Sequence, residues 1–206
     1  MVSIDRKSIT DGLRALLVDK TSKPGVYGAH EVSIDWGTKH PRYVDYMTFS
    51  PAGTVYVSDI EKGIFTCYEI KSCYEDLYSG KGLNFIGEKN YLVTTMGVWK
   101  RIAEDTRSLL ETGRTYGKED KLSRHIVECN PESKYSIGHN IGVLVPVPSW
   151  CTKQDVFEQF QNPTGFTGED LGNWKLTTMI PCSASNRRRS MTEMLFYMVK
   201  ARGHKK

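Results

Sequence analysis

The chain has 206 residues, of which 39% are hydrophobic, 25% charged and 11% aromatic. This length suits one domain, and the composition excludes collagen, coiled coil and extensive disorder. The formal net charge is +4, but it is unevenly distributed. Residues 187–206 contain seven basic residues against one acidic residue, so the preceding residues carry a net charge of −2. The basic character therefore belongs to one end of the chain.

The sequence contains no apolar run of membrane-spanning length, and residues 1–7 lack the apolar stretch of a secretory signal. No Cys-x-x-Cys pair occurs, which argues against a structural zinc site and a disulfide framework. We therefore expect reduced thiols in a cytoplasmic protein. The five cysteines are Cys67, Cys73, Cys129, Cys151 and Cys182.

The first half of the chain predicts a helix followed by an antiparallel meander. Apolar residues in 8–18 recur at helical spacing, and Lys23-Pro24-Gly25 ends that segment. Runs rich in β-branched and aromatic residues follow, separated by turn residues. The predicted strands are 27–36, 42–49, 55–58 and 64–71.

The second half predicts alternating helices and strands with two long irregular segments. Residues 72–77, 98–111 and 190–200 are expected to be helical, and 91–95 and 141–145 to be strands, the last stopped by Pro146 and Pro148. Residues 112–139 and 149–175 are expected to be insertions, the second mostly loop with a short helix at 153–161. The whole chain is then expected to be one α/β domain, a mixed sheet flanked by helices, with a basic C-terminal helix within 187–203.

Ionisable residues are predicted on core-facing sides of two neighbouring strands. Because side chains alternate along a strand, Glu69 and Lys71 share a face with Phe65, and Asp45 shares one with Met47. An isolated buried charge is costly, so these groups need partners. A bound Mg²⁺ or Mn²⁺ would supply one, because hard cations take oxygen ligands. The competing interpretation, about equally supported by spacing alone, is a buried carboxylate–lysine pair with no catalytic role.

Four segments together resemble the PD-(D/E)xK nuclease superfamily, and most closely its MmcB-like phage and prophage branch. They are Tyr43-Val44-Asp45-Tyr46, Cys67-Tyr68-Glu69-Ile70-Lys71 with the helix after it, Leu83-Asn84-Phe85-Ile86-Gly87 with Asn90-Tyr91-Leu92-Val93, and Arg187-Arg188-Arg189 with residues 190–195. The resemblance covers about 8–110, 140–146 and 180–203. It departs from the motif at Val44, which stands where the name of the superfamily has Pro.

The resemblance implies a restriction-endonuclease-like core and a catalytic site. Asp45 and Glu69 would be metal ligands, with the Ile70 carbonyl as a third, and Lys71 would orient or help deprotonate the attacking water. Glu31 occupies the place where many members carry a further acid on the first strand; a solvated glutamate is the equally supported alternative. The cofactor would be Mg²⁺ or Mn²⁺, which polarises phosphate and lowers the pKa of bound water.

The basic residues predict contact with nucleic acid. Arg187, Arg188 and Arg189 would bind phosphates and make binding steeply salt-dependent, although a solvated helix start explains them about as well. Lys81 and Lys89 are further candidates for contact with the nucleic-acid backbone, as is Asn84, in a loop that could equally be a solvated surface.

These features together predict a metal-dependent nuclease that hydrolyses DNA phosphodiester bonds in phage or prophage DNA processing or repair. Its location would be the cytoplasm, that of the bacterial host if the protein is phage-encoded. An RNA substrate remains open. The alternative is a nuclease fold without catalysis that binds nucleic acid or protein, for example as an inhibitor of a host defence system.

Overall fold

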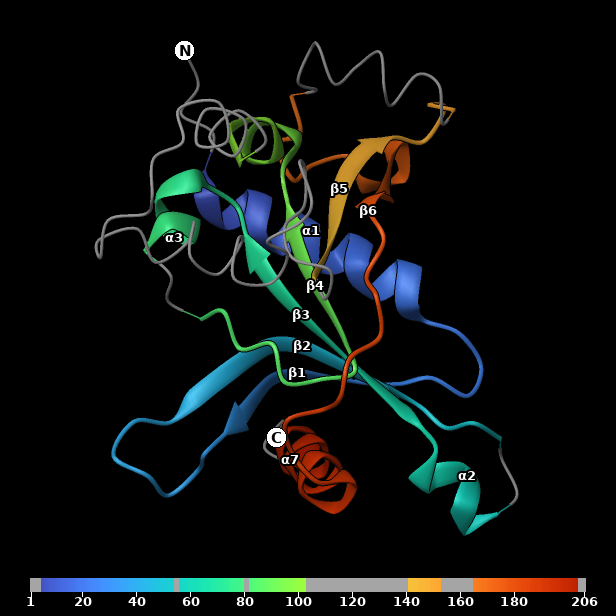
Figure 1. The fold of residues 1–206 in the computed structure, drawn as a ribbon. Coiled ribbons are helices and arrows are strands. Elements are labelled where there is room, and N and C mark those ends of the chain that lie inside the picture. Colours follow the sequence, from blue (N-terminus) through green and yellow to red (C-terminus); the bar gives the residue numbers. More distant parts are fainter. Residues whose placement is uncertain (1–4, 54–55, 80–81, 103–140, 153–164, 204–206) are drawn as a thin grey trace, which may run out of the picture.

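The computed structural model describes residues 5–53, 56–79, 82–102, 141–152 and 165–203. A six-stranded mixed sheet has helices on both faces (Figure 1). The strands are β1 (Tyr27–Ile34), β2 (Arg42–Ser50), β3 (Ile64–Lys71), β4 (Lys89–Thr94), β5 (Ile141–Pro148) and β6 (Trp174–Ile180). The helices with both ends described are α1 (Arg6–Thr21), α2 (Val57–Glu61), α3 (Tyr74–Tyr78) and α7 (Met191–Gly203), with a 3₁₀ turn at Leu171–Asn173. A further helix begins at residue 96 and is described to residue 102.

The strands lie in the sheet in the order in which they occur along the chain. β1, β2 and β3 form an antiparallel meander, β4 and β5 continue parallel to β3, and β6 closes the sheet antiparallel to β5. The predicted α/β class with a mixed, helix-flanked sheet is confirmed, and this arrangement is compatible with a restriction-endonuclease-like core.

Helix α1 covers one face of the sheet because its apolar stripe faces the strands. Leu13, Leu16 and Leu17 are buried against Tyr68 of β3 and Leu176 of β6. Asp5 accepts a hydrogen bond from the Lys7 amide and caps the helix, which begins two residues before the predicted start at residue 8.

The opposite face is covered in two parts. Helix α7 packs its buried Met194 and Met198 over β1 to β3. The helix that begins at residue 96 covers β4 and β5 with the buried side chains of Trp99 and Ile102. Between these two apolar clusters, the loop before β4 contributes Ile86 to the first cluster and Leu83 and Phe85 to the second.

Three local predictions are wrong. The predicted strand 55–58 is wrong at residues 57 and 58, which begin helix α2, because the Asp59 carboxylate accepts the Tyr56 amide hydrogen bond at 3.1 Å and starts a helical turn. Pro146 and Pro148 lie inside β5, whose pairing with β4 ends at residue 144, so β4 requires no N–H donor at the two proline positions. Strand β6 begins at Trp174, inside the stretch expected to be mostly loop.

The described part of 149–175 contributes two buried side chains, Cys151 and Phe166, to the core. Phe166 is buried against α1, and a Cβ on Gly12 would lie 2.6 Å from the Cα of Gly168, so helix and segment touch through their backbones. The predicted insertion 112–139 and the predicted helix 153–161 lie outside the described residues. Within the described residues, no helix is long and apolar enough to span a bilayer. The cysteines described there, Cys67, Cys73, Cys151 and Cys182, are free thiols, as expected.

Candidate active site at the ends of β2 and β3

The side-chain alternation of β1 and β2 is interrupted at Glu31 and Asp45. Val32 pairs with Val44 and Ala29 with Met47, yet all four pack in the same apolar cluster beneath α7. Strict alternation would place Val44 and Met47 on opposite faces. Glu31 adopts a left-handed backbone, φ 49°, which non-glycine residues rarely do, and so accommodates the change of face. The regular alternation from which the sequence predicts a shared face for Asp45 and Met47 therefore does not hold between Val44 and Met47.

The interruption turns Asp45 toward the neighbouring strand β3. Pairing between β2 and β3 stops at Tyr46 and Tyr68, so the next amides of β3 lack a backbone partner on β2. One Asp45 carboxylate oxygen, Oδ2, accepts the Ile70 amide hydrogen bond at 2.7 Å. Asp45 thus continues the strand pairing with its side chain, and its carboxylate is held beside Glu69.

Glu69 is fully buried at the seam between the two apolar clusters on the α7 face. Its Oε1 accepts a hydrogen bond from the Asn84 amide at 3.0 Å. Its Oε2 is buried and has no hydrogen-bond partner among the described residues. A buried carboxylate oxygen without a partner is costly, so a proton or a cation is needed there.

The carboxyl groups of Asp45 and Glu69 interact with each other. Two ionised carboxylates have no proton to share, so a hydrogen bond between them requires that one be protonated. Burial, followed by the nearby Asp45 charge, raises the pKa of Glu69 to about 9. Burial also raises the pKa of Asp45, although the Ile70 amide opposes the shift. Without a cation, the pair therefore holds one proton near neutral pH.

Lys71 lies beside this pair, two residues beyond Glu69 on the same strand. Its side chain is only 8% exposed, and its Nζ lies 3.4 Å from Asp76 Oδ2 of α3. Gly82 faces both groups, because a Cβ at that position would lie 3.2 Å from Lys71 Nζ and 3.9 Å from Glu69 Oε2. The φ of Gly82 is 71°, so the close approach and the backbone conformation both favour glycine.

Asn84 fixes the arrangement from the loop before β4. It is 8% exposed, its amide binds Glu69, and its Nδ2 donates to the Tyr43 carbonyl at 2.7 Å. It therefore connects the beginning of β2 to the end of β3. This burial does not favour the predicted contact of Asn84 with a nucleic-acid backbone. In the sequence, Asn84 is marked only by its place in the segment that resembles the nuclease family.

Glu31 does not join the two acids. Its side chain is 72% exposed and lies 3.9 Å from Arg14 of α1. The solvated alternative describes it better than the further catalytic acid. Arg14, by contrast, was not predicted from the sequence, and its positive charge acts on Asp45 from the α1 side. Arg14 follows the buried Leu13 in the sequence. A cation beside an apolar helical stripe is common, so nothing in the sequence indicates that Arg14 acts on Asp45.

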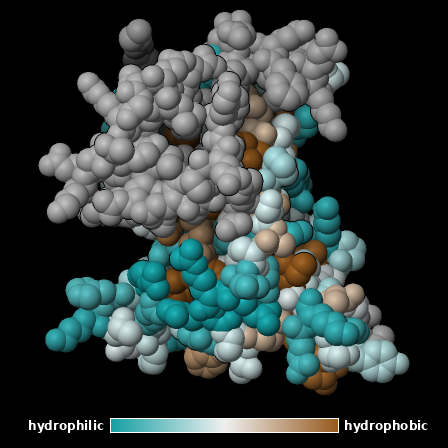
Figure 2. All heavy atoms as spheres, viewed as in Figure 1, coloured by the Kyte–Doolittle hydropathy of each residue, from teal (hydrophilic) through white to brown (hydrophobic). Residues whose placement is uncertain are grey.

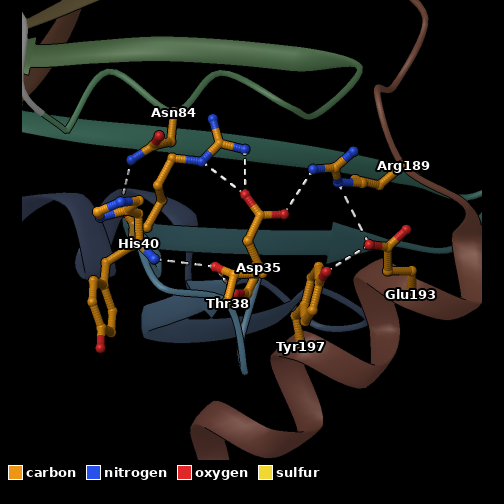
Figure 3. A network of polar contacts seen from close by, with 9 residues as sticks. Asp35, Thr38, His40, Asn84, Arg189, Glu193 and Tyr197 are labelled. Atoms are coloured by element: carbon orange, nitrogen blue, oxygen red, sulfur yellow. Dashed lines mark hydrogen bonds and ion pairs between the residues drawn. The ribbon is translucent and has the colours of Figure 1, made fainter.

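The three consecutive arginines precede α7 instead of lying in it, and two of them pair with acids. Arg187 Nη1 lies 2.6 Å from Glu88 Oε1, and Arg189 Nη2 lies 2.7 Å from Asp35 Oδ1 (Figure 3). Asp35 also accepts a hydrogen bond from Arg42 Nε at 2.8 Å, and these arginines lower the pKa of its carboxyl. The network ties the β1–β2 turn to the segment before α7.

Arg188 is the one arginine of this run that is exposed. Its guanidinium has no hydrogen-bond or ion-pair partner among the described residues, while its amide binds the Ile86 carbonyl. It lines a hollow of about 160 Å³ together with Arg42 and Asn84. Figure 2 shows hydrophilic side chains gathered over the segment that leads into α7. Of the predicted nucleic-acid contacts within the described residues, Arg188 is therefore the one that shares a hollow with Asn84, whose backbone amide binds Glu69. Lys81 lies outside the described residues, and Lys89 lies on β4, where it lines a different pocket.

The residues present would supply only some of the ligands of a divalent cation. No group of three or more acidic, histidine or cysteine side chains assembles within the described residues. Two carboxylates and the Ile70 carbonyl would leave several positions to water and phosphate, as Mg²⁺ commonly has. The partnerless Glu69 Oε2 requires either a proton or such an ion.

Comparison with known proteins adds no identification. No protein-family model matches the chain, and neither a curated protein nor a solved structure matches it.

Proposed function

We propose that the chain is a metal-dependent nuclease that hydrolyses phosphodiester bonds of DNA. The observation that carries the proposal is the buried, partnerless Glu69 Oε2 beside Asp45, with Lys71 on the same strand. The resemblance to MmcB-like proteins supports a role in phage or prophage DNA processing or repair.

In this proposal Asp45, Glu69 and the Ile70 carbonyl hold Mg²⁺ or Mn²⁺. The bound ion supplies positive charge to the phosphate oxygens. Lys71, whose side chain is largely shielded from solvent and lies close to Gly82, orients the attacking water and offsets negative charge on phosphate. The water oxygen bonds to phosphorus, the bond from phosphorus to the leaving oxygen breaks, and a proton passes to that oxygen. Arg188 binds the neighbouring backbone.

The test is a gel assay with Mg²⁺ or Mn²⁺ on supercoiled plasmid, linear duplex, single-stranded DNA and RNA. The variant is Lys71→Met, which keeps the volume of the buried stem, and the control is Lys62→Met at an exposed lysine. We expect wild type and control to cleave DNA and Lys71→Met to lose at least about a hundredfold in rate, as removal of one charge-stabilising group does. Equal cleavage by both variants would contradict the assignment of Lys71, and cleavage of RNA alone would change the substrate.

A specific observation favours the non-catalytic alternative. Asp45 binds the Ile70 amide and Lys71 lies beside Asp76, so each has a structural partner within the chain. A nuclease fold retained as a binding module would keep these contacts. Calorimetry with Mn²⁺ separates the two functions, because an enzyme requires binding that depends on Asp45 and Glu69, whereas a binding module does not.

A further inference from the structure

A second polar hollow, of about 370 Å³, lies between the C-terminal end of α1 and the sheet. Its floor is a row of side chains across three adjacent strands: Thr48 of β2 pairs with Thr66 of β3, and Thr66 with Lys89 of β4. Its rim contains Lys20 of α1 and Lys23 of the following turn. We call this the lysine pocket, defined by Lys20, Lys23, Thr48, Thr66 and Lys89.

The two threonines of the floor are unusual for their position. Thr48 is 3% exposed and Thr66 is 9% exposed, on the face where apolar and aromatic side chains pack beneath α1. Both threonines and Tyr68 line the hollow, and the two threonine side chains lower the pKa of the Tyr68 hydroxyl against the larger, raising effect of burial. Several hydroxyl donors therefore converge where packing alone would favour apolar residues.

The charge of the lysine pocket is of one sign. Three lysines line it, and no acidic residue is among the described residues that do. Burial and the neighbouring Lys23 lower the pKa of Lys20, whose Nζ donates to the Leu176 carbonyl at 3.0 Å. The negative end of the α1 dipole explains one lysine in the last turn, but it does not explain Lys23 and Lys89, which come from other segments.

We propose that the lysine pocket binds a phosphate group. Ammonium groups supply the charge, and the threonine and tyrosine hydroxyls donate hydrogen bonds to the phosphate oxygens. The pocket is separate from the Asp45–Glu69 pair, because Tyr68 and Glu69 are consecutive residues and face opposite sides of β3. The proposal therefore does not require the chain to be a nuclease. The phosphate could belong to a nucleic-acid backbone or to a small molecule, and both present the same chemistry.

The test compares two triple variants with equal changes in net charge. Lys20→Ala/Lys23→Ala/Lys89→Ala removes the cations of the pocket, and Lys7→Ala/Lys39→Ala/Lys62→Ala removes three exposed lysines elsewhere. Inorganic phosphate and a 5′-mononucleotide are titrated into each protein in EDTA and followed by amide chemical shifts. We expect shifts at residues 20–23 and 89 in wild type and control, and at least about tenfold weaker binding in the pocket variant. Single Lys23→Glu, at an exposed turn, must weaken binding in the same direction even if the triple variant does not fold.

A second arm uses short single-stranded and duplex DNA in EDTA, at several salt concentrations. If the phosphate belongs to nucleic acid, the pocket variant shows a salt slope that is smaller by about 2 to 3, since each phosphate contact contributes about 0.9. If the ligand is a small phosphate, only the first arm responds to the variant. No change in residues 20–23 and 89 with any probe, or equal weakening in both triple variants, would overturn the proposal. If the wild-type protein binds phosphate in this test but does not cleave DNA in the gel assay, the proposed nuclease function is rejected and the phosphate site is retained.

Discussion

Replacement of Glu69 by Gln should remove a pH-dependent cost from the metal-free protein. In the folded chain the pKa of Glu69 is raised from 4.5 to about 9, so the carboxyl stays protonated where the unfolded chain has ionised it. The folded state then binds more protons than the unfolded state, and stability falls as pH rises between those two values. The slope is about 1.4 kcal/mol per pH unit, which amounts to roughly 3 kcal/mol between pH 5 and pH 7.

The assay is urea unfolding in EDTA at several pH values, followed by tryptophan fluorescence. We expect the free energy of unfolding of Glu69→Gln, relative to that of wild type, to increase steadily up to about pH 9, because the amide cannot ionise. Glu31→Gln, at a side chain 72% exposed, is the control and should follow wild type. Parallel curves for wild type and Glu69→Gln would refute the reasoning, because Glu69 would then ionise normally within the fold.

Three further outcomes follow from the contacts. Arg189→Ala should lower stability by about 1 kcal/mol, a decrease in Tm of about 2 to 4 °C, because it removes the ion pair with Asp35. Arg188→Ala should change Tm little and weaken DNA binding. Calorimetry measures the first effect and a DNA-binding assay the second. Gly82→Ala should cost about 1 to 2 kcal/mol through its left-handed backbone, measured by unfolding, and unchanged stability would contradict its φ of 71°. At a Mn²⁺ concentration about a hundred times its Kd, wild type should gain about 2.7 kcal/mol of stability, and Glu69→Gln much less.

The sequence predicts the sheet best where one face of each element is apolar. The stripe of α1 repeats its apolar residues at helical spacing, and the strands of the meander are rich in β-branched and aromatic residues between turn signals, so the sequence locates these elements even though the alternation of β1 and β2 is interrupted. Strand β6 was missed because Leu176 is its one buried apolar residue, so no alternation marks it. Pro146 was interpreted as a strand end because the sequence does not show that β4 stops pairing before that position.

The site was predictable as residue types but not as geometry. Glu69 and Lys71 follow regular alternation along β3, so spacing alone places them together on a core face. The position of Asp45 depends on a change of face shared with Glu31 on another strand, which no pattern within either strand contains. The ion pairs of Arg187 and Arg189 join residues far apart in the sequence, so the run of arginines alone does not reveal that two of its members have acidic partners within the chain.

These contacts determine which substitution distinguishes chemistry from structure at Asp45. Asp45→Ala removes the acceptor of the Ile70 amide and would leave a partly buried donor without a partner, at a cost of about 1 to 3 kcal/mol. Loss of activity in that variant would therefore have two explanations. Asp45→Asn keeps an oxygen acceptor for the amide while removing the negative charge that a cation requires. A stable Asp45→Asn protein that neither binds Mn²⁺ nor cleaves DNA would assign the carboxylate to metal binding, whereas full cleavage by that variant would leave it only its part in holding β2 to β3.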